Sequence, residues 1–302
     1  MGHHHHDSLG HDMSGKNSGI SIILNVLVTL VQIIGGLISG SLSLLSDAVH
    51  NFSDVVSLFV SLLANKLSKK KASVNNTFGY KRAEIIAAFM NSALLMVISI
   101  FLIVEAIERF FTPQEIATDW VIWLAVLAIL VNGFSVLLLK KDAEVNMNMK
   151  SAYLHLFTDM MASIAVLIGG IVMKYYAMFW IDPMLTLLIA LYLIYVGYDL
   201  LKKSTKVLML FTPKSIAVKE IVSNISEIDG IKNVHHVHVW QLNEKEIHLE
   251  AHIDFKKDIK LSEFDDVLEE IEEIVYYKYG INHVNIHPEY NKPDSKNIIV
   301  QD

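Results

Sequence analysis

The sequence contains no cysteine among its 302 residues. This absence excludes a disulfide framework, thiolate metal ligands and a cysteine nucleophile. Charged residues are scarce as well: they make up 19% of the chain, against roughly 25% in a typical soluble domain. Hydrophobic side chains reach 53%, and the mean hydropathy is +0.41. The composition predicts a membrane protein in which any transition-metal chemistry relies on histidine and carboxylates.

The formal net charge of −7 is unevenly distributed along the chain. Residues 213–302 contain ten Lys, no Arg and eighteen Asp or Glu, a net charge of −8, which leaves +1 for residues 1–212. We therefore expect a nearly neutral membrane part followed by an acidic soluble part. An acidic surface would repel the phosphates of nucleic acid, so we expect no nucleic-acid partner.

Six stretches are long and apolar enough to cross a lipid bilayer, which takes about 20 residues each. We place them at residues 20–42, 44–66, 86–108, 120–140, 151–173 and 179–201. Because five spans follow the first, we interpret residues 20–42 as a retained helix rather than a cleaved signal peptide. The sequence thus predicts a six-helix transmembrane domain over residues 16–212.

Lysine and arginine gather on one side of these spans, at position 16 and within 66–82, 140–150 and 202–206. The opposite side has only Arg109 and Lys174. Since positive loops stay in the cytoplasm, both termini are expected there. We predict a multi-pass protein of a bacterial inner membrane or plasma membrane.

A small α/β domain is expected over residues 213–290. Helical periodicity and alternating apolar residues predict helix 215–228, strands 234–240 and 247–253, helix 261–279 and strand 281–286, in the order αββαβ. Gly280 suits the end of the second helix. Such a chain can form a two-layer sandwich in which two helices cover one face of the sheet.

Both ends of the chain are polar. Residues 1–15 contain the run His3 to His6, followed by His11. This run is either the remnant of a purification tag or a native metal-binding tail, and both interpretations stay open. Residues 291–302 form a short C-terminal tail after the last predicted strand.

Two of the predicted spans carry ionisable side chains, which are costly in a bilayer and rare there without a function. His50 and Asp54 lie in the second span, and His155 and Asp159 lie in the fifth, each pair in a His-x-x-x-Asp motif. Four-residue spacing puts both side chains of a motif on one helix face. Two such faces together supply two imidazoles and two carboxylates, a tetrahedral donor set that Zn²⁺ accepts. Co²⁺, Cd²⁺ and Ni²⁺ rank behind it, and Ca²⁺ or Mg²⁺ would need more oxygen ligands.

Other interpretations of these polar residues are open. A single intramembrane His or Asp can form a hydrogen bond between helices, and a chain of such groups can relay protons without a metal. Duplication of the motif in two separated spans favours metal binding. Asp47, which lies three residues before His50, is interpreted as an outer partner of the metal ligands, as an entry group for the ion, or as a helix-start cap near Ser43 and Ser46.

Four segments carry a family resemblance: GSLSLLSDAVHNFSD at 40–54, FGYKRAE at 78–84, the second motif at 155–159 and Asp182-Pro183. Together they resemble the cation diffusion facilitator family in its zinc-transporting branch. The resemblance implies a homodimeric antiporter with six helices per subunit and a ferredoxin-like cytosolic domain. It also implies export of divalent metal from the cytoplasm in exchange for protons. The transport site would consist of His50, Asp54, His155 and Asp159.

The resemblance further implies a regulatory zinc cluster in the cytosolic domain. The family's ligand positions correspond to His235, His252, His287 and Glu289. A further position, at which the family has histidine, falls near Asp265, a weaker ligand that leaves the number of bound ions open. The other histidines of the domain are interpreted as surface or packing residues: His236, His238, His248 and His283.

Metal and protons are expected to compete for the transport site. An imidazole with an unperturbed pKa of about 6.5 is mostly neutral at cytosolic pH, and protonation on an acidic side lowers its affinity for metal. Alternating exposure of the site would let a proton gradient drive zinc outward. Two other functions stay open, a membrane metal sensor that signals through its cytosolic domain and an intramembrane metalloenzyme. The sequence has no His-Glu-x-x-His motif, so we expect no enzyme activity.

Overall fold

The computed structural model describes residues 16–145, 147–243 and 245–300. These residues divide into two compact units. The first comprises residues up to 60 together with 90–200, and the second comprises 61–89 together with the residues from 201 onward. The second unit therefore includes the connection between the second and third helices as well as the C-terminal part of the chain.

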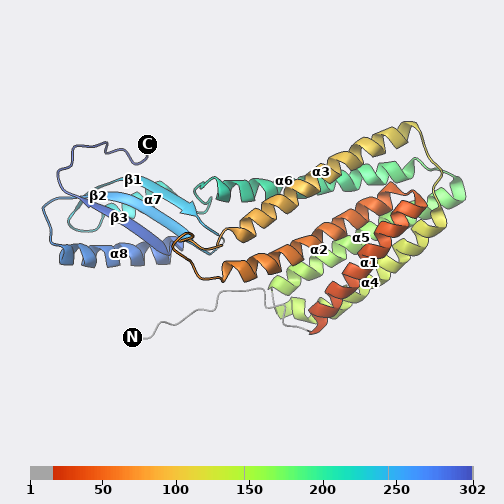
Figure 1. Cartoon of the computed structure of the whole chain (residues 1–302), viewed down its shortest axis with the longest axis horizontal. Helices are drawn as coiled ribbons and strands as arrows, with labels where there is room; N and C mark the ends of the chain where they lie inside the picture. The colour runs from red at the N-terminus through yellow and green to blue at the C-terminus, as the bar shows by residue number, and fades with distance from the viewer. Residues whose placement is uncertain (1–15, 146, 244, 301–302) are drawn as a thin grey trace. The chain divides into compact units, whose positions relative to one another are not determined.

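Six long helices precede residue 209 in the described chain (Figure 1): α1 (Lys16–Ser39), α2 (Leu42–Ser68), α3 (Ala83–Phe111), α4 (Thr118–Val145), α5 (Met147–Tyr176) and α6 (Ile181–Leu208). Four described stretches have the length and composition needed to cross a membrane, at 83–111, 118–140, 153–176 and 181–208. Residues 23–39 form a shorter apolar helix. Each expected span overlaps one helix. The first was expected to reach residue 42 but ends at Ser39, because Gly40 takes a left-handed conformation (φ +70°) between α1 and α2.

Helices α1, α2, α4 and α5 lie together, and α3 runs beside α6 (Figure 1). Close approach depends on residues without a side chain. A Cβ atom at Gly197 on α6 would lie 3.2 Å from Cγ of Met96 on α3, and one at Gly35 on α1 would lie only 1.9 Å from Cδ1 of Leu124 on α4. Glycine therefore permits the close approach of α6 to α3 and of α1 to α4.

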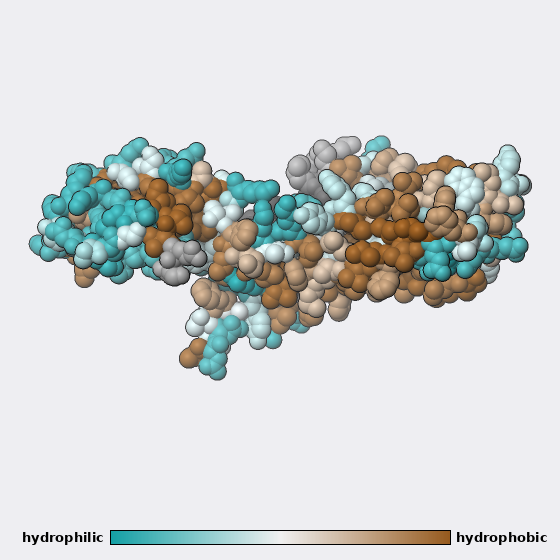
Figure 2. Space-filling model, turned by 90° about the horizontal axis from the view of Figure 1, so that it is seen from above, coloured by the Kyte–Doolittle hydropathy of each residue, from teal (hydrophilic) through white to brown (hydrophobic). Residues whose placement is uncertain are grey.

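The surface of this helical unit is largely apolar. Large hydrophobic side chains such as Phe101, Leu137 and Tyr195 are at least 70% exposed. Brown, hydrophobic residues dominate much of the helical part in Figure 2, whereas teal, hydrophilic residues cover much of the α/β part. Such a patch exceeds what a soluble monomer exposes, so lipid is the solvent that suits it.

The C-terminal α/β fold consists of α7 (Val218–Ser226), β1 (Ile231–Gln241), β2 (Ile247–Phe255), α8 (Leu261–Tyr279) and β3 (His283–Glu289). Strand β2 is central, antiparallel to β1 and parallel to β3. The predicted element order αββαβ is confirmed. Gly280 ends α8 in a left-handed conformation (φ +69°), as its position in the sequence indicates.

The core of this fold lies between the sheet and the two helices. Ile221 and Ile225 of α7, Leu249 of β2, and Ile271 and Val275 of α8 are all completely buried. The apolar positions of α8 recur every three or four residues, so one face of the helix packs on the sheet while its acidic face stays in water.

Replacing Ile271 by alanine removes a fully buried side chain from the middle of this core. The expected loss is about 2–5 kcal/mol of stability in the α/β fold, so the amides of β2 should exchange hydrogen faster in the full-length protein. Leu261→Ala changes the same helix where the side chain is 78% exposed, and it should keep wild-type exchange. Equal exchange in the two variants would contradict this core.

Candidate metal centre

The structure brings the two His-x-x-x-Asp motifs together. His50 and Asp54 lie on α2, and His155 and Asp159 lie on α5. His50 Nε2 is 3.3 Å from Asp159 Oδ1, and His155 Nε2 is 3.1 Å from Asp54 Oδ2. Within the motifs, His50 Nδ1 lies 3.7 Å from Asp54 Oδ2 and His155 Nε2 lies 3.5 Å from Asp159 Oδ2. The four side chains therefore form a ring in which each imidazole contacts both carboxylates.

The donor atoms of this ring fit a metal ion. One ligand atom from each of His50, His155 and Asp159 lies within 4.8 Å of the others, and Asp54 contacts both imidazoles. Asp159 is 1% exposed, and among the described residues neither of its oxygens accepts a hydrogen bond. A buried carboxylate in that condition needs a cation or a proton. Asp54 and His155, at 32% and 43% exposed, leave the ring accessible from one side.

Asp47 belongs to a buried polar network next to the ring. Its Oδ2 accepts hydrogen bonds from Gln32 Nε2 at 2.8 Å and from Ser163 Oγ at 3.3 Å. Gln32 in turn accepts a hydrogen bond from the side chain of Asn51. Asp47 lies about one helical turn before His50 on α2, and Ser163 lies one turn after Asp159 on α5. Its role as an outer partner of the ligands stays a prediction.

The cap at the start of α2 comes from a distant residue. Asp182, buried in the first turn of α6, accepts hydrogen bonds from the backbone N–H groups of Leu42 and Ser43 and from the hydroxyls of Ser41 and Ser43. The bonds to the Leu42 N–H (2.8 Å) and the Ser43 hydroxyl (2.6 Å) are short, as expected for a charged acceptor. The alternative in which Asp47 caps α2 is therefore wrong. Asp47 lies inside α2, and Asp182 accepts the hydrogen bonds of the N–H groups in the first turn of α2.

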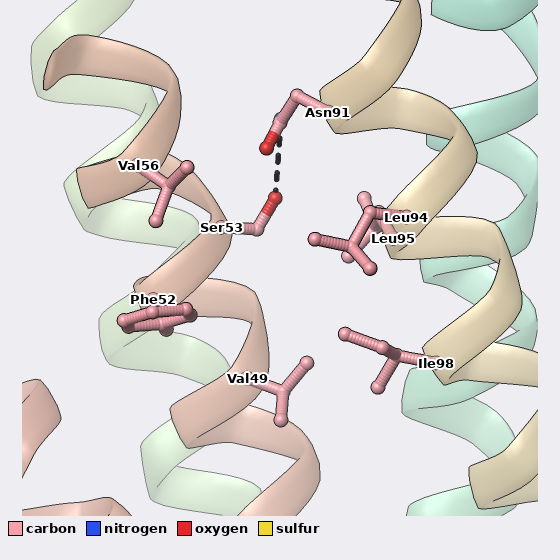
Figure 3. Close-up of a pocket in the computed structure, with 8 residues that line it drawn as sticks. All are labelled: Val49, Phe52, Ser53, Val56, Asn91, Leu94, Leu95 and Ile98. Atoms are coloured by element: carbon pink, nitrogen blue, oxygen red, sulfur yellow. Dashed lines mark hydrogen bonds between the residues drawn. The ribbon is translucent and has the colours of Figure 1, made fainter. Parts of the chain in front are cut away.

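The opposite face of α2 is loosely packed against α3. A small cavity of about 20 Å³ lies between the two helices, enough for roughly one water molecule. Figure 3 shows Asn91 of α3 reaching Ser53 of α2 across its edge, where Asn91 Nδ2 donates to Ser53 Oγ at 3.3 Å. Apart from Asn91 and Ser53, its lining is apolar: Val49, Phe52, Val56, Leu94, Leu95 and Ile98.

A second group of side chains that could bind a metal ion lies at one edge of the α/β fold. His235 of β1 is paired with His252 of β2, and Asp254 of β2 is paired with Glu289 of β3. His252 Nδ1 lies 2.8 Å from Glu289 Oε1, and His235 Nε2 lies 3.3 Å from Glu289 Oε2. One ligand atom from each of His235, His252, Glu289 and Asp294 lies within 4.8 Å of the others. We call these four residues the cytosolic cluster.

The protonation states in this cluster favour cation binding. Burial lowers the pKa of His252, so its imidazole is neutral at neutral pH. Burial alone would raise the pKa of Glu289, but hydrogen bonds from Lys292 and Lys296 outweigh it and the net pKa is lowered. A neutral imidazole beside an ionised carboxylate is the form in which both groups ligate metal.

Two expected ligands lie apart from this group. The side chain of His287 is 60% exposed, with Nε2 3.8 Å from Glu289 Oε1 and its ring stacked on His252. Asp265 is exposed on α8, because the neighbouring positions of that helix, such as Leu268 and Ile271, turn toward the core. The fourth member of the cytosolic cluster is instead Asp294 of the C-terminal tail, which was not predicted from the sequence.

Strand β1 departs from the regular alternation expected for 234–240. Both Val234 and His235 are buried, and the register with β2 shifts between His235 and His238. The two intervening residues form a bulge, in which His236 takes a positive φ of 49°. The sequence carried no bulge-favouring glycine here, and the irregularity depends on partners outside the sheet.

The other histidines of the domain make ring contacts. His248 is 4% exposed and lies between Trp240 and His283, with ring centroids 5.2 and 4.3 Å apart. Its pKa is lowered, first by burial and then by His283. His236 stacks on His252 and contacts His238.

Comparison with known proteins identifies the class. The chain matches the cation efflux transmembrane domain over residues 18–209 and the cytoplasmic domain of cation efflux proteins over 213–291. It therefore belongs to the cation efflux family, and the resemblance to cation diffusion facilitators is confirmed.

Individual relatives extend over almost the whole chain. It is 35% identical to the cadmium, cobalt and zinc/H(+)-K(+) antiporter of Bacillus subtilis, over 99% of this chain and 96% of the relative. It is 33% identical to the zinc transporter ZitB of Pectobacterium atrosepticum, over 97% and 91%. It is 31% identical to the metal cation efflux system protein CzcD of Cupriavidus metallidurans, over 94% and 89%.

Replacing Asp182 by alanine leaves the buried Ser41 and Ser43 groups at the start of α2 without their acceptor. We expect a loss of about 1–3 kcal/mol, seen as a lower midpoint of thermal unfolding in detergent, together with weaker zinc binding because α2 carries half of the ring. Asp119→Ala removes a 72% exposed carboxylate from the start of α4 and should leave both quantities unchanged. A wild-type midpoint for Asp182→Ala would show that this cap is dispensable.

Proposed function

We propose that this chain is an antiporter that exports Zn²⁺, and also Co²⁺ and Cd²⁺, from the cytoplasm in exchange for protons. The observation that carries the proposal is the ring in which His50, Asp54, His155 and Asp159 face one another from two helices. Its donor set suits zinc and its chemical relatives. The names of the relatives, which include zinc, cadmium and cobalt, support the same substrates.

The proposed architecture has six membrane spans, one for each of α1 to α6, followed by a ferredoxin-like cytosolic domain. The four clearly apolar helices, the mixed three-stranded sheet and the position of lysines along the chain support it, with both termini in the cytoplasm. The corresponding parts of the chain are a tail at 1–15, a transmembrane domain at 16–212, a cytosolic metal-sensing domain at 213–290 and a tail at 291–302. The distribution of lysine and arginine also fits a bacterial inner membrane.

Two copies of the chain are proposed to act as a homodimer. The family matched by residues 213–291 is named for a dimer, which supports pairing through the cytosolic domain. Metal bound to the cytosolic cluster would then report the zinc concentration on the side from which the transporter takes its substrate.

The mechanism follows from the ligand types in the ring. On the cytosolic side neutral imidazoles and ionised carboxylates take up the metal ion, and the buried Asp159 gains the positive charge that its position requires. When the ring faces an acidic compartment, protons replace the metal on the same nitrogen and oxygen atoms. Asp159 has a metal ion as its partner in the metal-bound ring and a proton in the protonated ring. Because one must replace the other, uptake of protons and release of metal are coupled.

A membrane metal sensor is the second candidate function, and the cytosolic cluster favours it. A sensor would bind zinc at His235 and Glu289 without moving it across the membrane. It gives no account of a metal-ligating ring between α2 and α5, so we rank it below transport. An intramembrane metalloenzyme ranks lower still, since the family is one of efflux proteins.

Removing a ring ligand should stop transport without unfolding the protein. We expect His50→Ala and Asp159→Ala to lose zinc flux into proteoliposomes and to bind zinc at the ring at least roughly tenfold more weakly. His283→Ala, which removes an imidazole outside both metal groups, is the matched control and should transport normally. Wild-type flux in either ring variant would refute this site, and flux lost in all three would point to unfolding.

A pH difference should drive zinc in a fixed direction. Zinc should accumulate in proteoliposomes whose lumen is about one pH unit more acidic than the bath, because protonation near the ordinary imidazole pKa of about 6.5 releases metal on the acidic side. Dissipating the gradient should abolish the accumulation. Uptake that is the same with and without the gradient would contradict proton exchange, and a protein that binds zinc but shows no flux would be a sensor.

A further inference from the structure

The C-terminal tail is attached to the bulge of β1. The backbone N–H of His236 donates to the carbonyl of Asn297 at 3.1 Å, and that of Val237 donates to the carbonyl of Ile298 at 2.8 Å. The side chain of Ile298 packs against the domain core. These two amides are the ones that the bulge turns away from β2, so the tail satisfies groups that the sheet leaves unpaired.

The same tail places an ammonium group at the cytosolic cluster. Lys296 Nζ donates to Asp254 Oδ1 at 2.9 Å and to Glu289 Oε2 at 3.1 Å, and it also pairs with Asp294. It lies 3.4 Å from His235 Nε2. Imidazole and carboxylate groups therefore surround a side-chain cation.

Buried charge explains why a cation is held there. Glu289 is 1% exposed and Asp254 is 8% exposed, and carboxylates this far from water require a positive partner. Lys296 is 36% exposed, so its long side chain reaches in from the surface and can return to water at a smaller cost.

We propose that Lys296 acts as an internal cation in the cytosolic metal site, and that a divalent ion displaces it and thereby releases the end of the C-terminal tail, from Lys296 onward, from β1. The inference rests on metal binding at the cytosolic cluster, and it adds a competing residue and a moving segment. The match to the family's cytoplasmic domain ends at residue 291, so the tail and Lys296 lie outside that match.

Competition follows from shared acceptor atoms. A metal ion on His235 Nε2 and Glu289 Oε2 would use two atoms that Lys296 already contacts. Two cations within contact distance of one carboxylate oxygen repel each other strongly in a partly buried site. The metal ion and the ammonium group therefore exclude each other.

The charge balance favours the divalent ion. Glu289 and Asp254 on the strands carry two negative charges. The tail brings two ammonium groups, Lys292 and Lys296, but also the carboxylate of Asp294, so it neutralises only one of those charges. A divalent ion neutralises both. Asp294 and Lys292 stay at the cluster. Once Lys296 has left, only two backbone bonds and the packing of Ile298 hold the end of the tail that follows it.

Zinc titration of the full-length chain in detergent tests the competition. The chain carries His50→Ala so that zinc bound tightly reports the cytosolic cluster, and a chelating dye competes for the metal. Lys296→Met should bind zinc roughly tenfold more tightly than the parent chain, whereas Lys296→Arg, which keeps the charge, should stay close to it. Lys256→Met is the matched control, because Lys256 is 59% exposed and pairs with Asp229 away from the cluster.

Hydrogen exchange of the parent chain tests the release of the tail. Saturating zinc should speed exchange at the amides of His236 and Val237, and Lys296→Met should speed it without zinc. Unchanged or slower exchange with bound zinc would overturn the release, and equal or weaker zinc binding by Lys296→Met would overturn the competition. Neither result concerns zinc flux by the chain with an intact ring. The proposed transport is therefore tested independently, by the flux measurements.

Discussion

Asp159 lies in the apolar interior of the helical unit with both carboxylate oxygens out of contact with water, and a charge in that position requires a counter-charge. The imidazoles of His50 and His155 stand on either side of it, from different helices. A neutral imidazole can bind a metal ion, and a protonated imidazole carries a positive charge itself. The same ring can therefore balance the charge of Asp159 either with a metal ion or with protons. The rest of the helical unit keeps α2 and α5 at the distance at which the four side chains of the ring meet.

The sequence was sufficient for the features that depend on local spacing. Four-residue spacing put each His and Asp of a motif on one face, and their duplication pointed to a shared ion. Alternating and helical periodicity gave the order αββαβ, because each element of the domain buries one face under its neighbour. Gly280 marked the end of α8 through its own backbone freedom.

Features that depend on residues far apart in the chain could not be predicted from sequence patterns. Asp182 caps a helix that begins 140 positions earlier, and Gln32, a lone amide in α1, holds Asp47. Neither partnership leaves a periodic signal, although a single amide in an apolar span hints at a hydrogen bond. The place of Asp294 in the cytosolic cluster likewise depends on the path of the tail across β1, and hydrophobic patterning cannot specify that path.

A small cavity behind α2 bears on the proposed alternating exposure of the ring. Helix α2 carries His50 and Asp54 of the ring on one face, while the face toward α3 borders a small cavity with an almost entirely apolar lining. If α2 tilted into this cavity it would lose few dispersion contacts, because the atoms that line a cavity have few neighbours on that side. The small cavity thus marks a place where α2 and α3 are not fully packed, whereas the hydrogen bonds to Asp182 tie the first turn of α2 to α6.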